Sequence, residues 1–388
     1  MKEIYLDNSA TTPLCEAAKG AMVSAMESYG NPSSKHRVGL AAYDILSGAR
    51  ARILSTLGVK GARDENLVFT SCGTEADNLA ILGVARAKAR RVDNRIITTD
   101  SEHSAVENCM KLLEAEGFEV IRLSTRGGVI DMDEFKQAMN DKTMLVSIMM
   151  VNNETGAKYN VKELFKYAKS VKRDVVTHCD AIQGYLKCRF SPSEIGADLV
   201  SISAHKIHGP KGVGALYISP EIIKKKQITP TTLGGGQESG FRSGTENIVG
   251  IAGFAAAAEA NYAELDKSIE TMRELREYAI GKLASLELKL NLPTGESAPH
   301  VINLTLPQIK SETMLNFLSG SSICISSGSA CSSHGKGVSR ALVGFGLTPF
   351  DADCSIRVSI SHYNTKEEID LLVSSLAEGI SRLVRIKR

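Results

Sequence analysis

Residues 144–180 read MLVSIMMVNNETGAKYNVKELFKYAKSVKRDVVTHCD. Residues 144–151 are almost continuously apolar, which is typical of a strand that is buried on both faces. Residues 162–170 are predicted to form a helix, and residues 175–179 form a second apolar strand. A strand, a helix and a second strand in this order are typical of parallel sheets, in which the helix makes the crossover.

The same alternation extends in both directions along the chain. The other expected strands are residues 66–70, 95–99, 119–123, 199–203 and 213–218. The other expected helices are residues 17–26, 39–57, 74–89, 104–116 and 132–139. We therefore expect an α/β fold, a mostly parallel sheet of about seven strands with helices on both faces.

The pattern changes from residue 248 onward. The remaining elements expected are a long alanine-rich helix at residues 250–285, strands at 300–306 and 355–361, and helices at 312–319 and 366–385. These elements predict a smaller α+β domain. We assign residues 15–255 to the large domain and residues 1–14 and 256–388 to the small one.

Composition excludes several classes of protein. The 388 residues carry 46 basic and 44 acidic side chains, a net charge of +2, so no nucleic-acid partner is expected. No segment approaches the roughly 18 uninterrupted apolar residues of a membrane helix, and the N-terminus lacks an apolar signal region. These features predict a soluble cytoplasmic protein that has no membrane association.

The eight cysteines are scattered and form no C-x-x-C pair, so the sequence contains neither a zinc ribbon nor a redox dithiol. No metal site is predicted. Most of these thiols are expected to be reduced, small, buried apolar groups.

Polar side chains follow three of the expected strands, where ligands bind in open α/β sheets. Thr74 follows the first strand, Asp180 follows residues 175–179, and Lys206 follows residues 199–203. Taken singly, each residue has a simpler explanation. Thr74 could be a helix cap, and Asp180 could be a helix cap, a metal ligand or an ion-pair partner. Lys206 could be a residue at the rim of the sheet whose amine reaches solvent. Together with Ser203 and His205 they supply what pyridoxal phosphate requires: a lysine for its aldehyde, an acid for its pyridinium nitrogen and donors for its phosphate.

Ordered motifs along the whole chain carry a family resemblance. They are LDNSATTP (6–13), GNPSSKH (30–36), TSCGTEADN (70–78), VNNETG (151–156), CDAIQ (179–183), SAHKIHGPKG (203–212), RSGTEN (242–247) and SSGSAC (326–331). In these motifs the sequence closely resembles the cysteine desulfurases of the NifS and IscS group, which are fold-type I pyridoxal phosphate enzymes of the class V aminotransferase type. The resemblance implies pyridoxal phosphate as the cofactor.

The resemblance also implies a role for individual residues of the cofactor site. Lys206 would hold the cofactor covalently and move protons, Asp180 would pair with the pyridinium nitrogen, and Gln183 would hydrogen-bond the ring hydroxyl. His103 would stack on the ring and act as acid or base near the leaving thiol. The residues implied to hold the phosphate are Gly73, Thr74, Ser203 and His205.

Three further residues are assigned by the resemblance alone. Asn153 would line the cofactor and substrate site, and Arg357 would bind the substrate carboxylate, ideally through two parallel hydrogen bonds. Thr245 would reach the phosphate of a neighbouring subunit, which implies a homodimer. Without the family, Arg357 would be interpreted as a surface arginine and His103 as a loop histidine.

Cys331 differs from the other cysteines because its surroundings, SSGSACSSHG at residues 326–335, are small and polar. Such a segment suits a thiol that must reach a substrate and then deliver sulfur. The resemblance implies that L-cysteine is converted to L-alanine and that its sulfur passes to Cys331 as a persulfide. This sulfur would then pass to an acceptor protein, such as a scaffold for iron–sulfur clusters, or serve the synthesis of thiolated tRNA or a cofactor. Cys324 could relay sulfur, but its setting, Ile-Cys-Ile, favours a buried strand.

Two other interpretations stay open at this point. One is a selenocysteine lyase or another fold-type I pyridoxal phosphate enzyme, such as an aminotransferase, although an aminotransferase has no need of Cys331. The other is a non-catalytic cluster scaffold, which would leave Lys206 and Asp180 without a purpose.

Overall fold

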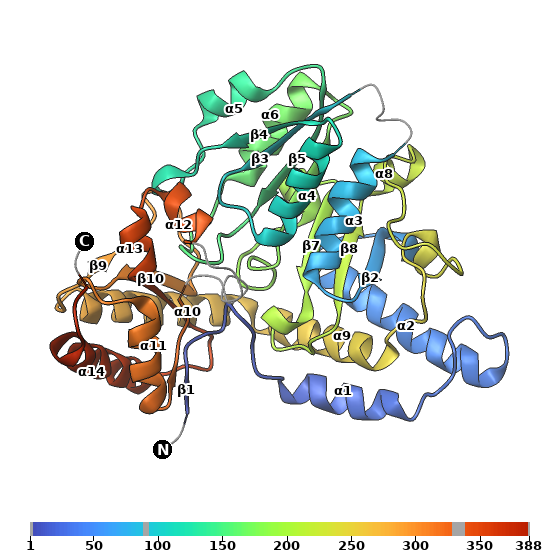
Figure 1. Ribbon diagram of the computed structural model, residues 1–388. Helices are drawn as coiled ribbons and strands as arrows, with labels where there is room; N and C mark the ends of the chain where they lie inside the picture. Colours follow the sequence, from blue (N-terminus) through green and yellow to red (C-terminus); the bar gives the residue numbers. More distant parts are fainter. Residues whose placement is uncertain (1–2, 88–92, 328–337, 387–388) are drawn as a thin grey trace.

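The computed structural model describes residues 3–87, 93–327 and 338–386. Its largest sheet has seven strands in the order β2-β8-β7-β6-β5-β3-β4 (Figure 1). Their bounds are β2 Leu67–Thr70, β3 Arg95–Thr99, β4 Glu119–Leu123, β5 Thr143–Met149, β6 Val176–Asp180, β7 Leu199–Ser203 and β8 Gly214–Ile218. Each of the seven expected strands is therefore present, with shifts of up to two residues at the ends.

The sheet is mostly parallel, as predicted, and β8 alone runs against the other six strands. Only residues 204–213 connect β7 to β8, and a parallel neighbour requires a crossover of a dozen or more residues. The chain therefore turns back directly after β7. The carboxyl ends of the other six strands lie at one edge of the sheet.

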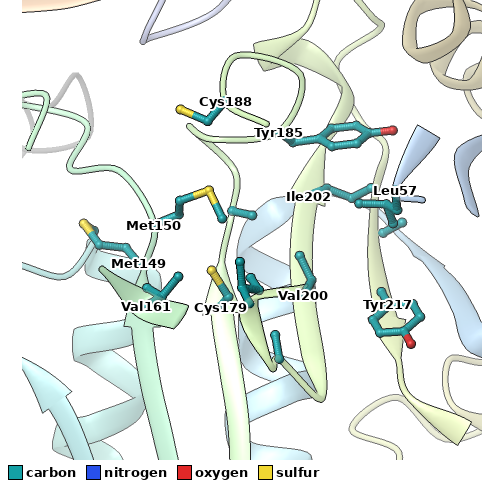
Figure 2. Packing of buried hydrophobic residues seen from close by; sticks show 14 of the residues in the cluster. Leu57, Met149, Met150, Val161, Cys179, Tyr185, Cys188, Val200, Ile202 and Tyr217 are labelled. Atoms are coloured by element: carbon teal, nitrogen blue, oxygen red, sulfur yellow. The ribbon is translucent and has the colours of Figure 1, made fainter. Parts of the chain in front are cut away.

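Helices cover both faces of this sheet. On one face α3 (Gly73–Ala85) and α4 (Ser104–Ala115) pack against β-strand side chains such as Leu199. On the other face α2 (Arg37–Thr56), α6 (Val161–Val171) and α9 (Ile248–Ala263) pack against side chains such as Val200 and Ile202. Figure 2 shows this second core around Cys179, Met149 and Tyr185. Successive strand residues point to opposite faces, which explains why the strands are apolar throughout.

Strand β1 and the elements from α10 onward gather beside one end of the large sheet (Figure 1). An antiparallel sheet has the order β12-β10-β9, and β1 pairs with β11 in parallel. These strands are β1 Ile4–Tyr5, β9 Lys289–Leu290, β10 Val301–Thr305, β11 Ile323–Cys324 and β12 Ser355–Ser359. They pack with α10 (Leu265–Leu283), α11 (Ser311–Gly320) and α14 (Lys366–Arg382). Ile4 and Leu6, from the N-terminal segment that we assign to the small domain, belong to this core. The boundaries of the two domains stay a prediction.

Two expectations for this region were wrong. The helix expected at residues 250–285 is two helices, α9 and α10, because the backbone leaves helical geometry at Glu264 (φ −109°, ψ 17°). Cys324 is only half-buried, because its strand β11 is two residues long and lies at a sheet edge.

The shorter helices complete the described part of the chain. They are α1 (Glu16–Met26), α5 (Met132–Ala138), α7 (Pro192–Ile195), α8 (Pro220–Lys224), α12 (Arg340–Phe345) and α13 (Pro349–Asp353). No helix of the described ranges is long and apolar enough to cross a membrane.

Candidate active site

A cavity of about 170 Å³ opens at the carboxyl edge of the large sheet. Ten of the residues singled out from the sequence line it: Gly73, Thr74, His103, Asn153, Asp180, Gln183, Ser203, His205, Lys206 and Arg357. Two others do not. Thr245 is exposed and does not line this cavity, and Cys331 lies outside the described residues.

One end of the cavity is suited to an anion. Helix α3 begins at Gly73, and both Gly73 and Thr74 line the cavity. The first backbone N–H groups of a helix have no partner within the helix, so those of α3 are available to an anion at this end of the cavity. Ser203 lies beside Gly73 in the lining, and its hydroxyl is buried and has no hydrogen-bond partner among the described residues. A Cβ atom at Gly73 would lie 2.3 Å from Cδ1 of Ile182, so a larger residue at this position would force Ile182 or the start of α3 to move. The lining therefore suits a phosphate group.

Asp180 is the last residue of β6, and Lys206 follows β7 in a short 3₁₀ turn. Asp180 accepts a hydrogen bond from the Ile182 backbone N–H (2.9 Å). Burial raises the pKa of Asp180 to about 6, although this hydrogen bond and the Lys206 charge oppose the rise. A buried carboxylate of this kind gains a counter-charge when a protonated pyridine nitrogen binds beside it.

The Lys206 amine is held by the N-terminal segment of the chain. Its Nζ donates to the carbonyl oxygens of Ser9 (2.7 Å) and Ala10 (2.8 Å). His205 reaches the same segment, with 3.2 Å between its Nδ1 and the Thr11 hydroxyl. Sequence reasoning gave no role to Ser9 and Ala10, although the motif at residues 6–13 was a signal that this segment belongs to the site.

Gln183 has both ends of its side-chain amide engaged. Its Nε2 donates to the Ser9 carbonyl (2.9 Å), and its Oε1 lies 3.3 Å from Lys187 Nζ and 3.4 Å from His300 Nε2. Lys187 and His300 were also missed, because neither directly follows the carboxyl end of an expected strand of the large sheet.

His103 precedes α4, and its Nδ1 accepts a hydrogen bond from the Ala105 N–H (3.2 Å). Burial, and then the charge of Lys206, lower the pKa of His103 to about 4. At neutral pH the ring is therefore uncharged, with its proton on Nε2. His103 is half-buried and lines the cavity, so it is not the exposed loop histidine that the sequence alone suggested.

Arg357 is not a surface arginine, because it is only 1% exposed on strand β12, where it lies opposite Asn303 of β10. Its Nη2 pairs with Asp7 Oδ1 (2.7 Å), and its Nη1 donates to the Asn153 carbonyl (2.9 Å). The guanidinium has five N–H groups, so three of them are not used by these two bonds. Arg357 thus lines the cavity with donors to spare for a carboxylate.

The residues present fit pyridoxal phosphate. The orphaned Ser203 hydroxyl beside the start of α3 suits the phosphate, buried Asp180 suits the pyridinium nitrogen, and Lys206 supplies the amine. In the described ranges no group of three or more acidic, histidine or cysteine side chains is arranged to hold a metal ion.

Comparisons with known proteins identify the family of this chain. The family model described as Aminotransferase class-V matches residues 4–372. The cysteine desulfurase IscS of Dictyoglomus turgidum is 39% identical over 98% of this chain and 95% of its own length. A solved NifS-like protein is 35% identical with a TM-score of 0.90, covering 98% of this chain and all of that one. The solved structure titled SspA in complex with cysteine is 29% identical with a TM-score of 0.79, covering 94% of this chain and all of that one.

The fold and the cavity define a fold-type I enzyme that depends on pyridoxal phosphate. The chain belongs to the class-V aminotransferase family and, within it, to the cysteine desulfurases of the NifS and IscS group.

Proposed function

We propose that this protein converts L-cysteine to L-alanine and transfers the sulfur to Cys331 as a persulfide. The observation that carries the proposal is the single cavity in which Lys206, Asp180 and the start of α3 meet. The relatives are named as cysteine desulfurases and not as selenocysteine lyases, which favours this activity over the alternative.

Arg357 orients the substrate. Its unused N–H groups bind the carboxylate of L-cysteine, while Asp7 and the Asn153 carbonyl fix the guanidinium. Gly73, Thr74, Ser203 and His205 would hold the phosphate of the cofactor, and Asp180 and Gln183 would hold its ring. Bound pyridoxal phosphate supplies an electron sink that weakens the carbon–sulfur bond of the substrate.

Lys206 Nζ removes the proton from the substrate's α-carbon and returns protons as the product forms. His103 presents its Nε2 proton to the reacting atoms while its Nδ1 is held by the Ala105 N–H. The Cys331 sulfur bonds to the substrate sulfur as the carbon–sulfur bond breaks. The electron pair that remains on carbon is then protonated, so the products are a persulfide and alanine, and no external oxidant is needed.

An acceptor protein receives the sulfur from Cys331, and a scaffold for iron–sulfur clusters is the acceptor we propose. Thr245 is exposed, which suits a role in the site of a second subunit in a homodimer. We place the reaction in the cytoplasm, because Cys331 must be a reduced thiol to accept sulfur and thiols stay reduced there.

Alanine release from L-cysteine tests the proposal. The pyridoxal-loaded protein, with a reductant present, is compared with Lys206→Ala and with Lys211→Ala, an exposed lysine outside the cavity. Turnover by the parent and by Lys211→Ala, with none by Lys206→Ala, supports the proposal. Release of hydrogen sulfide and pyruvate in place of alanine would contradict it.

A further inference from the structure

Lys187 is a second lysine behind the cavity and is 7% exposed. It lies four residues after Gln183, in the turns that follow β6. No carboxylate of the described residues forms an ion pair with it, and its Nζ lies 3.3 Å from Gln183 Oε1. A buried lysine without a counter-charge is unfavourable to folding, so its presence here requires an explanation.

The Gln183 amide joins this lysine to Lys206. The Ser9 carbonyl can only accept, and it accepts from both Gln183 Nε2 (2.9 Å) and Lys206 Nζ (2.7 Å). This fixes the amide, with its nitrogen toward Ser9 and its oxygen toward Lys187. The two amines are thus connected through one amide and one carbonyl group.

Few other charges act on this pair of amines. The ionisable groups that face Lys187 are Lys206, Arg357, Cys188, His205, His208 and His300. Burial lowers the pKa of His205 to about 3 and of His208 to about 4, and it lowers the pKa of His300 well below its ordinary value. Burial also raises the pKa of Cys188 to about 11. Near neutral pH these four groups are uncharged.

Among the described residues that face Lys187, the charged groups are thus Lys206 and Arg357, and Asp180 interacts in turn with Lys206. Burial, and then the charge of Lys206, lower the pKa of Lys187 to about 7. The Lys187 amine therefore exchanges its proton in the pH range in which the enzyme must work.

We propose that Lys187 is a positioning residue for Lys206 and Gln183: it anchors the Gln183 amide, and its positive charge disfavours a proton on the Lys206 nitrogen. A nitrogen kept free of its proton can attack a carbonyl and accept the substrate's proton. This inference rests on the proposed function for its purpose, although its electrostatic part can be tested separately.

The test compares Lys187→Met, Lys187→Gln and Lys187→Arg with the parent, all loaded with pyridoxal phosphate. The control is Lys158→Met, a half-buried lysine that pairs with Glu296 outside the cavity. The visible absorption of the cofactor, which responds to the proton on the attached lysine nitrogen, is followed against pH. Cofactor affinity is measured in the same variants.

The midpoint of the absorption change should rise by about 1 pH unit in Lys187→Met and Lys187→Gln, which remove a nearby positive charge. It should not rise in Lys187→Arg or in the control. Lys187→Met, which also removes the hydrogen bond to Gln183, should bind the cofactor about fivefold more weakly than Lys187→Gln. The same midpoint in the parent, Lys187→Met and Lys187→Gln would overturn the proposal.

Two further results keep the test decisive. If Lys187→Met does not fold, Lys187→Gln measures the loss of charge. If a folded variant loses the cofactor, the rate at which acetic anhydride modifies Lys206 across pH replaces the absorption. Failure of the parent to release alanine would overturn the proposed function, whereas the midpoint shift would still decide the role of Lys187.

Discussion

Gly73 offers the sharpest test of the geometry at the phosphate end of the cavity. The substitution Gly73→Ala places a methyl group 2.3 Å from Cδ1 and 3.0 Å from Cγ1 of Ile182. Both distances are shorter than ordinary contacts between carbon atoms, which lie near 3.5–4.0 Å. Either Ile182 must change its rotamer, or the first turn of α3 must move away from Ser203.

Overpacking of this kind costs about 1–3 kcal/mol. If the strain falls on the start of α3, the dissociation constant of pyridoxal phosphate should rise roughly 5- to 150-fold. Titration of the cofactor-free protein, followed by the visible absorption of the bound cofactor, measures this change.

The double variant Gly73→Ala/Ile182→Ala isolates the cause, because it removes both carbon atoms that the new methyl group meets. Its affinity should return toward that of Ile182→Ala alone, with a coupling energy of about 1 kcal/mol or more. Weaker binding in Gly73→Ala that is strictly additive with Ile182→Ala in the double variant would refute this geometry, whereas parent-like affinity in Gly73→Ala would show that Ile182 moves and α3 does not.

Three further predictions concern charge and stability. Burial raises the pKa of Glu102 from 4.5 to about 8, so between these pH values the folded protein keeps a proton that the unfolded chain has lost. The free energy of unfolding should therefore fall as pH rises from about 4.5 to 8, by at most about 1.4 kcal/mol per pH unit. Glu102→Gln should flatten this slope in urea unfolding across that range, and an unchanged slope would show that Glu102 is ionised. Arg50 and Glu238 form a buried ion pair (2.8 Å), so Arg50→Met should lower the free energy of unfolding by about 3–5 kcal/mol. Arg52 pairs with Glu259 at an exposed position, so Arg52→Met should change this free energy by less than about 1 kcal/mol. Equal losses of stability in the two variants would contradict the effect of burial. Because burial and Lys206 lower the pKa of His103 to about 4, its NMR signals should stay constant between pH 6 and 8, and a midpoint near 6.5 would show that the ring is solvated.

The sequence predicted the large sheet well, because its strands are buried on both faces and therefore strongly apolar. It predicted the small sheet less well. Strands β1, β9 and β11 have two residues each, too few for any alternation to be recognised. The break between α9 and α10 at Glu264 was also missed, since no glycine or proline marks it.

The same contrast holds within the site. Asp180 and Lys206 were predicted because the ends of parallel strands meet at one edge of a sheet. Ser9 was not, because its role depends on a segment that is distant in sequence, and Lys187 was not, because it does not directly follow a strand. The Ser9 carbonyl and Lys206 are 197 positions apart and are joined only by the folded chain.

The most direct test of the central claim is to find where the substrate sulfur goes. The loaded protein is mixed with L-cysteine without reductant, and the peptide that contains Cys331 is examined by mass spectrometry, with Cys331→Ser and Cys324→Ser treated in parallel. We predict that the parent and Cys324→Ser each release alanine and carry one added sulfur atom on Cys331. Cys331→Ser should neither release alanine by turnover nor carry the added sulfur. Alanine release by Cys331→Ser at the parent's rate, with no sulfur on Cys331 in the parent, would contradict the account.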